Sequence, residues 1–346
     1  MNFSQDISQL YDGELPVITT IDSHTEGEVT RLLVDGVPEI PGSTMMEKLT
    51  CFKNRHDHVR CLMTREPRGS RQVLAALVTE PVTPDAAFGL IYMDARRYPF
   101  LCGHATIGAV TTLFKTGSLA LAEGEHRVGI DTPSGRMTAL AHVRKGELTS
   151  VSIDMVPTFV FATDRKVQVE GFGTICLDLV CAGGFFAMVN TEQLSLEPVL
   201  ANRSVLVDLG MKIIAAANDQ LTVMHPERPD VTTVDVTEFY DTVTTGSPAR
   251  GRGMVVYGES HMDRSPCGTG TAAKLALLHH YGKIDLHQPY VNASPMGTTF
   301  TAQLVEETRI GDLAASITRV SGRAWITGVH HFVLDDTDPF EKGYLV

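Results

Sequence analysis

Two cysteines stand where helices are expected to begin. Cys267 ends a polar run, and the Ala- and Leu-rich stretch 272–278 behind it is typical of a helix. Cys102 similarly precedes the apolar stretch 107–114, which Gly117 can end. A cysteine at a helix start meets free backbone N–H groups and the positive end of the helix dipole, so we expect the thiolate to be favoured there.

The two cysteine stretches also match each other. Glycine follows each cysteine directly, and threonine stands four places after it. A lone cysteine before a helix is more often a small buried hydrophobic residue than a catalyst, so the prediction depends on the match. Two such thiols could face one another and exchange a proton with opposite faces of one carbon atom. The glycines would let a ligand approach the backbone.

Composition limits the class of protein. The chain has 346 residues, of which 43% are hydrophobic and 20% charged, which predicts a globular protein of two domains. A net charge of -12 argues against nucleic acid and acidic membranes as partners. The first residues lack the basic and apolar regions of a signal peptide, and no apolar run has the length of a membrane span. We therefore expect a cytoplasmic protein.

The six cysteines are expected to be free thiols, because the chain is large and no signal peptide is evident. No pair has the two-residue spacing of a structural zinc site. Cys102 and His104 could both bind a metal, but no further ligands are evident. No phosphate-binding loop or dinucleotide fingerprint appears. These residues give no positive sign of a metal, nucleotide or dinucleotide site.

The remaining pattern consists of short strands at steady spacing with few helices, which indicates an α+β fold and not alternating βαβ units. A helix is expected from residue 43, with Thr44 and Glu47 spaced as a capping box. A further amphipathic helix is expected over 206–218. The polar stretch 22–31 is either a hairpin with a solvated face or a loop that shapes a binding site through His24 and Glu26. Strands are expected at 17–21, 73–78, 89–93, 126–130, 175–180, 231–236 and 253–257.

Several motifs make the chain similar to the proline racemase family, which includes 4-hydroxyproline epimerases and trans-3-hydroxyproline dehydratases. The resemblance covers nearly the whole chain, and the motif around the second cysteine is the most specific. The motifs are 22–28 (DSHTEGE), 40–43 (IPGS), 66–69 (EPRG), 102–104 (CGH), 131–133 (DTP), 183–186 (GGFF), 263–271 (DRSPCGTGT) and 337–340 (TDPF).

This resemblance implies two pseudo-symmetric domains, each a curved, mostly antiparallel β-sheet or barrel wrapped round a central helix, as in diaminopimelate epimerase. The expected domains are 1–157 plus 329–346, with Cys102, and 158–328, with Cys267. The last strand returns to the first domain. Family members use neither pyridoxal phosphate nor metal and are usually homodimers that act on a small imino acid.

The resemblance also implies roles for individual residues. Cys102 and Cys267 would be the opposed acid and base. The backbone N–H groups of the two helix starts would hold the substrate carboxylate, and two side chains would contact the ring nitrogen. Dehydratases carry Thr in place of the second cysteine, so this chain is expected to racemise or epimerise. The carboxylate-binding residues are Gly103, His104, Gly268 and Thr269, and the ring-nitrogen contacts are Asp263 and His104.

The substrate is predicted from two further positions. Proline racemases tend to place bulky Phe around the ring, whereas this chain has Leu74 and Tyr257. Leu74 leaves room, and Tyr257 offers a hydroxyl to a ring OH, because a buried OH without a partner costs about 1–3 kcal/mol. We therefore expect a 4-hydroxyproline epimerase, which converts trans-4-hydroxy-L-proline to cis-4-hydroxy-D-proline. Segments 98–101 and 292–297 depart from the usual family pattern and are expected to border the binding site.

Other functions remain open at this level. A proline racemase is the first alternative, and a trans-3-hydroxy-L-proline dehydratase is the next. A cysteine hydrolase would pair Cys102 with His104, which would need an unusual turn because they are two residues apart. A binding protein that retains the fold without catalysis is the last alternative.

Overall fold

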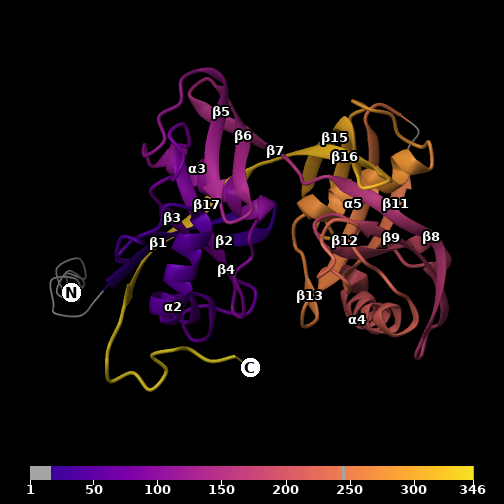
Figure 1. The fold of residues 1–346 in the computed structure, drawn as a ribbon, viewed down its shortest axis with the longest axis horizontal. Coiled ribbons are helices and arrows are strands. Elements are labelled where there is room, and N and C mark those ends of the chain that lie inside the picture. The colour runs from indigo at the N-terminus through magenta and orange to yellow at the C-terminus, as the bar shows by residue number, and fades with distance from the viewer. Residues whose placement is uncertain (1–16, 244–245, 346) are drawn as a thin grey trace. The chain divides into compact units, whose positions relative to one another are not determined.

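The computed structural model describes residues 17–243 and 246–345 of the chain (Figure 1). The N-terminal residues, from which the sequence predicted that there is no signal peptide, lie outside this range. Contacts divide the chain into two compact units. Unit 1 comprises Met1–Thr25, Val29–Val151 and Arg323–Val346, and unit 2 comprises Glu26–Glu28 and Ser152–Gly322. The chain thus passes to unit 2 and returns for its last strand, with crossings a few residues before the predicted boundaries at 157 and 329.

Unit 1 is built on a mixed sheet in which neighbouring strands are mostly close in sequence. The strands pair in the order β17, β1, β2, β3, β4, β5, β6. The pairs β2–β3 and β4–β5 are parallel, and the pairs β17–β1, β3–β4 and β5–β6 are antiparallel. Their bounds are β17 Ala324–Val333, β1 Val17–Thr25, β2 Glu28–Asp35, β3 Leu74–Thr79, β4 Phe88–Met93, β5 Gly124–Thr132 and β6 Gly135–Arg144, and β7 (Glu147–Asp154) leads the chain into unit 2.

Unit 2 repeats this order and closes on itself. The strands pair in the order β8, β9, β10, β11, β12, β14, β15, β16, and β16 pairs with β8 again, which makes a barrel. The parallel pairs β10–β11 and β12–β14 match β2–β3 and β4–β5. The bounds are β8 Thr158–Val169, β9 Gly173–Cys181, β10 Phe185–Asn190, β11 Val234–Val243, β12 Ala249–Tyr257, β14 Tyr290–Ala293, β15 Thr299–Ile310 and β16 Leu313–Gly322, with the short β13 (His261–Met262) beside β12.

One helix in each unit packs against several strands of that unit. In unit 2, α5 (Gly268–His280) contacts β8, β9, β10, β12, β15 and β16, and it is buried from Gly270 to Leu278. In unit 1, α3 (Gly103–Lys115) packs on β1, β3 and β17. Helix α2 (Met45–Thr64) packs on β3, β4 and β5, and α4 (Arg203–Gln220) packs mainly on β11, β8 and β12. The short 3-10 helices are η1 (Thr191–Leu194) and η2 (Leu200–Asn202). The predicted α+β fold of two pseudo-symmetric, sheet-dominated halves with central helices is confirmed.

The predicted helix start near residue 43 is also confirmed, with one difference. Thr44 caps α2, since its Oγ1 accepts a hydrogen bond from the Glu47 backbone N–H at 3.1 Å. The Glu47 carboxylate, in turn, accepts from the backbone N–H of Ser43 at 2.8 Å, one residue before the expected partner. The box therefore satisfies backbone donors on both sides of the cap.

The polar stretch 22–31 forms a hairpin between β1 and β2, which was one of the two predictions. Its charged side chains, however, are buried and not solvated. Glu26 and Gly27 form the turn, with φ angles of 47° and 108°. Asp22 and Arg31 are buried and paired, with Arg31 Nη2 2.9 Å from Asp22 Oδ2. A buried ion pair needs this close geometry because both charges lose water.

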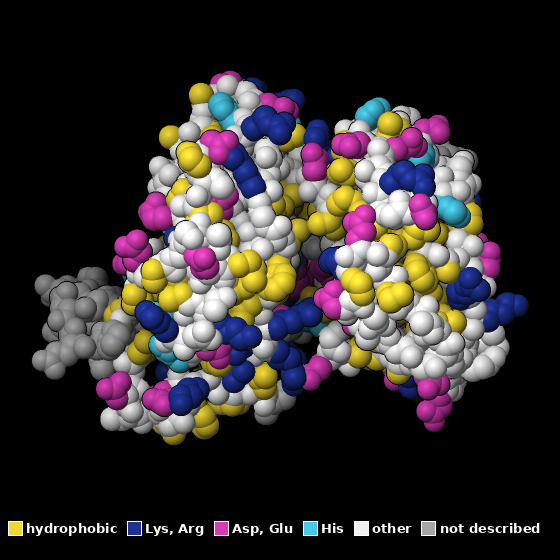
Figure 2. Space-filling model, viewed as in Figure 1, with side chains coloured by type: hydrophobic (Ala, Val, Ile, Leu, Met, Phe, Trp, Pro, Cys, Tyr) yellow, Lys and Arg dark blue, Asp and Glu magenta, His cyan; other side chains and the backbone are white. Residues whose placement is uncertain are grey.

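The charged surface carries both signs. On the face drawn in Figure 2, acidic and basic side chains are interspersed over each unit, with exposed hydrophobic side chains between them. Among residues 17–243 and 246–345, no helix is long and apolar enough to cross a membrane.

Because α5 is enclosed, its apolar side chains should control the stability of unit 2. Leu277 is fully buried, whereas Leu200 is 49% exposed. We predict that Leu277→Ala lowers the free energy of unfolding by roughly 2–5 kcal/mol, the usual range for a buried Leu→Ala change. Urea unfolding followed by circular dichroism measures this. The control Leu200→Ala should change the midpoint little, and equal effects of the two variants would contradict the enclosed position of α5.

Candidate active site

Cys102 is the N-cap residue of α3, as predicted from the sequence. Its backbone is extended, with φ -149° and ψ 112°. The sulfur lies 3.3 Å from Nδ1 of His104, and Cys102, Gly103 and His104 are all half-buried. The His104 carbonyl oxygen accepts a hydrogen bond from Thr25 Oγ1 at 2.7 Å, which ties the helix start to β1. The expectation that an unusual turn would be needed to pair Cys102 with His104 is wrong, because an ordinary helix start brings them together.

Cys267 is the N-cap residue of α5, but its backbone is different. It has φ 58° and ψ 118°, a conformation that L-residues rarely adopt and that costs about 1–3 kcal/mol. The sulfur accepts a hydrogen bond from the Gly270 N–H at 3.4 Å and lies 3.5 Å from Thr269 Oγ1. Cys267 is buried, and Gly268 and Thr269 are half-buried. The two cysteines therefore share a place in the topology but not a backbone conformation.

The loop before Cys267 is held by hydrogen bonds between its own residues. Asp263 is buried, and its Oδ1 accepts from the Ser265 backbone N–H and hydroxyl, both at 2.8 Å. Ser265 Oγ accepts in turn from the Cys267 backbone N–H at 3.1 Å. Asp263 thus fixes the approach to the cysteine, whatever further contact it makes with a ligand.

Next to this loop, the buried Glu28 pairs with the half-buried Arg264, a contact that the sequence did not predict. Glu28, at the start of β2, accepts hydrogen bonds from Arg264 at three donors: the backbone N–H at 2.9 Å, Nε at 3.0 Å and Nη2 at 2.9 Å. His261 Nε2 lies 3.5 Å from Glu28 Oε1. The rings of Tyr257 and His261 pack edge to face, with 4.7 Å between their centroids. Glu28 and Arg264 both lie in the quoted motifs, but only the fold shows that they pair.

Electrostatics at Cys267 oppose the expected thiolate. Burial is the largest cause and raises the pKa of the Cys267 thiol well above its usual range. The negative charge of Asp263 raises this pKa further, whereas Thr269 and the Gly270 N–H lower it. The prediction that the helix start favours a thiolate is therefore wrong for Cys267, because desolvation outweighs the hydrogen bonds of the first turn.

The two predicted ring-contact residues lie at strand ends. Leu74 begins β3 in unit 1, and Tyr257 ends β12 in unit 2, and both are half-buried. Two further segments, 98–101 and 292–297, were predicted to border the site. Phe100, just before Cys102, is 53% exposed, whereas Asn292 is completely buried.

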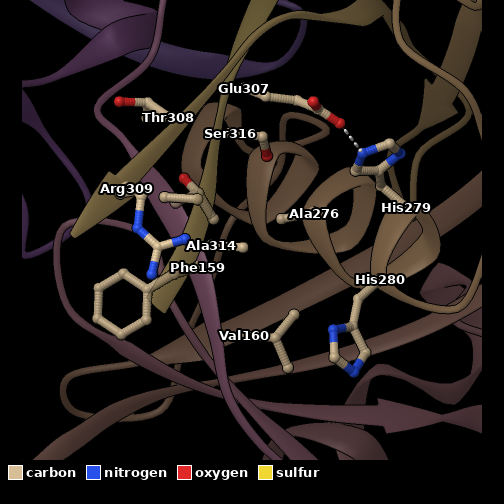
Figure 3. A pocket seen from close by; sticks show the side chains of 12 residues that line it. Phe159, Val160, Ala276, His279, His280, Glu307, Thr308, Arg309, Ala314 and Ser316 are labelled. Carbon is tan, nitrogen blue, oxygen red and sulfur yellow. Dashed lines mark hydrogen bonds and ion pairs between the residues drawn. The ribbon is translucent and has the colours of Figure 1, made fainter. Parts of the chain in front are cut away.

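A separate hollow of unit 2 lies at the other end of α5 (Figure 3). It measures about 400 Å³. Ala276 and His279 from α5 and residues of β8, β15 and β16 line it, and His279 Nε2 is 2.9 Å from Glu307 Oε1. None of the predicted site residues lines this hollow. Within the described residues, no group of three or more His, Cys, Asp or Glu side chains could hold a metal ion.

Comparison with known proteins shows which family this chain resembles. The family described as "Proline racemase" matches residues 20–345. A proline racemase of Clostridioides difficile is 38% identical over 329 residues, which cover 95% of this chain and 98% of the relative. A 4-hydroxyproline 2-epimerase of Streptosporangium roseum is 39% identical over 331 residues, covering 95% and 98%.

A solved structure of a protein with a related name is also similar to this chain. The hydroxyproline epimerase from Agrobacterium vitis, with bound trans-4-OH-L-proline, has a TM-score of 0.83 and 30% identity, covering 96% of each chain. This chain has an α+β fold of two matched halves, each with a cysteine at the start of its central helix. The chain belongs to the proline racemase family and is an isomerase.

The Glu28–Arg264 pair should stabilise unit 2 more than a surface pair does. We predict a coupling free energy of roughly 1.5–3 kcal/mol for Glu28→Gln and Arg264→Met in a double-mutant cycle, as for hydrogen bonds to charged groups. Urea unfolding of the single and double variants measures it. The exposed pair Lys212–Asp208, at 3.0 Å, is the control and should give less than about 1 kcal/mol. Equal coupling in both pairs would contradict a larger stabilising effect of the Glu28–Arg264 pair.

Proposed function

We propose that this isomerase epimerises 4-hydroxyproline at Cα, converting trans-4-hydroxy-L-proline to cis-4-hydroxy-D-proline without a cofactor. The observation that carries the proposal is the pair of cysteines at the N-caps of topologically equivalent helices, Cys102 on α3 and Cys267 on α5. We propose also that the enzyme acts as a cytoplasmic homodimer, as the family resemblance implies.

The chemistry follows from the two thiols. In one direction, the Cys102 thiolate takes the α-proton, and the electron pair of the broken C–H bond is delocalised into the substrate carboxylate. Cys267 then gives its thiol proton to the opposite face of the same carbon. The step leaves Cys102 as thiol and Cys267 as thiolate, so the reverse reaction uses the opposite roles. The raised pKa of the buried Cys267 thiol suits a proton donor.

The carbanion must be stabilised by the protein itself. The backbone N–H groups of Gly103, His104, Gly268 and Thr269 belong to first turns of helices, where N–H groups have no partner within the helix. We propose that these groups hold the carboxylate, where preorganised dipoles favour the developing charge. Asp263 and His104 would contact the ring nitrogen, and the Asp263 carboxylate would match the charge of a secondary ammonium.

The choice of 4-hydroxyproline is supported by Leu74 and Tyr257, together with the bound trans-4-OH-L-proline of the A. vitis enzyme. Proline is the alternative substrate, because a proline racemase is about as similar to this chain as a 4-hydroxyproline epimerase is. The presence of a cysteine at position 267 disfavours the dehydratase.

Proton NMR in D2O distinguishes these functions when L-proline, trans-4-hydroxy-L-proline and trans-3-hydroxy-L-proline are offered separately. We expect deuterium at Cα and a growing epimer signal from 4-hydroxyproline. The same result from proline alone would make the protein a proline racemase. Loss of ring signals from 3-hydroxyproline would make it a dehydratase, and no exchange with any of the three would refute the proposal.

The two thiols should be separable from the other cysteines. We predict that Cys102→Ser and Cys267→Ser each reduce kcat by at least roughly 10²–10⁴-fold, because a serine hydroxyl is a poor base and acid for this proton. Cys176→Ser, on β9, is the matched control and should retain activity close to that of the unaltered enzyme. Epimer formation measured by polarimetry or NMR decides this, and a Cys267→Ser variant with full activity would exclude the two-base mechanism.

Tyr257 should select for the ring hydroxyl. We predict that Tyr257→Phe lowers kcat/KM for 4-hydroxyproline by roughly tenfold relative to proline, since an unpaired buried hydroxyl costs about 1–3 kcal/mol. The measurement is the ratio of kcat/KM for the two substrates, which cancels general damage to the enzyme. Tyr240→Phe, on β11, serves as the control. An unchanged ratio in Tyr257→Phe would remove the hydroxyl contact from the proposal.

A further inference from the structure

A buried ion pair lies behind the first turn of α5. Lys274 follows Cys267 by two helical turns, and Glu238 lies on β11. Both side chains are completely buried, and Lys274 Nζ is 3.4 Å from Glu238 Oε1. Removing two charges from water costs more than such a pair commonly returns in stability. A pair in this position therefore calls for a reason other than stability.

The Lys274 ammonium connects to the residue directly before the cysteine. Its Nζ donates hydrogen bonds to the Arg252 carbonyl oxygen and to Asn292 Oδ1, both at 2.8 Å. The Asn292 amide nitrogen donates to the Pro266 carbonyl oxygen at 3.0 Å and to Thr271 Oγ1 at 2.8 Å. One buried amide thus joins the ammonium to the turn that contains Cys267.

The Glu238 carboxylate is brought against the same turn by two glycines. A Cβ atom at Gly253 would stand 2.6 Å from Glu238 Oε1, and one at Gly270 would stand 2.7 Å from Oε2. Gly270 is also the residue whose N–H contacts the Cys267 sulfur. Neither carboxylate oxygen has a hydrogen-bond partner among the described residues. Burial raises the pKa of Glu238, and the Lys274 ammonium, 3.4 Å from Oε1, opposes this shift and supplies a balancing charge.

The equivalent position beneath Cys102 carries no charge. There, the Tyr92 hydroxyl lies 2.6 Å from Thr106 Oγ1, which donates to the Cys102 carbonyl oxygen at 2.8 Å. The buried Ala109 stands two turns after Cys102, in the place that Lys274 has after Cys267. The fold of a unit therefore does not itself require a buried ion pair under its central helix.

We propose that Glu238, Lys274 and Asn292 are positioning residues for Cys267, which hold its left-handed turn through Pro266 and set a negative charge against the turn that carries the sulfur. The catalytic meaning of this arrangement rests on the proposed function: it makes Cys267 the proton donor in the substrate-free enzyme and distinguishes it from Cys102.

The charges around Cys267 agree in sign with this role. Asp263, from the preceding loop, and Glu238, from β11, both disfavour the thiolate and raise the pKa of the thiol, after burial as the main cause. Thr269 and the Gly270 N–H act in the opposite direction. The Lys274 ammonium of α5 pairs with the Glu238 carboxylate and donates a hydrogen bond to Asn292. The Arg264 guanidinium pairs with the Glu28 carboxylate. Tyr240 and Tyr257 are the titratable groups of the apolar cluster around the thiol.

Alkylation of the full chain by iodoacetamide over a range of pH tests the proposal, with Cys267 and Cys102 read from their separate peptides by mass spectrometry. Removal of a nearby negative charge lowers a thiol pKa. In Glu238→Gln we therefore expect Cys267 to react roughly tenfold faster at about pH 8, which corresponds to one pKa unit. The Cys102 peptide from the same sample should keep its profile.

Two further variants separate charge from structure. Glu238→Asp retains the charge and should return the Cys267 profile most of the way to that of the unaltered enzyme. Tyr92→Phe removes the buried hydroxyl beneath Cys102 and should leave Cys267 unchanged. An unaltered Cys267 profile in a folded Glu238→Gln variant would overturn the proposal.

One measurement needs no variant and applies if Glu238→Gln does not fold. In the unaltered enzyme, the alkylation midpoint of Cys267 should lie above the usual range of a cysteine thiol, because burial and the carboxylates of Asp263 and Glu238 raise the pKa of this thiol. A midpoint within the usual range would refute the proposal. Since no substrate is present, the result is independent of whether the chain turns over 4-hydroxyproline.

Discussion

A helix enclosed by strands can offer a ligand only its ends, and this constraint organises unit 2. Strands β8 to β16 close around α5 and bury it from Gly270 to Leu278. The N-terminal end is the chemically useful one, because it combines unpaired backbone N–H groups with the positive end of the dipole. The fold thus places Cys267 at the part of the helix that can both hold an anion and carry a reactive group.

Enclosure also has an electrostatic consequence. The position that offers N–H donors to Cys267 removes water from its sulfur, and here desolvation is the larger effect. A helix start is therefore not sufficient to make a thiolate. Cys102, by contrast, is half-buried and lies 3.3 Å from a histidine ring nitrogen. Two sites with the same sequence pattern therefore offer different surroundings to their thiols.

Polar contacts in unit 2 hold the loop that leads to Cys267. The Glu28–Arg264 pair and the Asp263–Ser265 hydrogen bonds hold the loop before Cys267 from one side, and the Lys274–Asn292 bonds hold it from another. Together these contacts maintain a residue at φ 58°, which an isolated chain would rarely populate. The energy of the strained turn is offset by buried hydrogen bonds whose partners come from β2, β12, β14 and α5.

The sequence alone was enough to predict the two cysteines at helix starts, the α+β class, the capped start of α2 and membership of a racemase family. Each of these depends on local spacing and motifs. The hairpin at 22–31 was one of two predictions, and its buried charges were not foreseen, because burial depends on what packs against a turn. Glu28 and Arg264 are 236 positions apart, and Lys274 is 36 positions from Glu238 and 18 from Asn292. Only the tertiary structure decided these pairings and the raised pKa of Cys267, since long-range packing determines which charges lose their water and which of them meet.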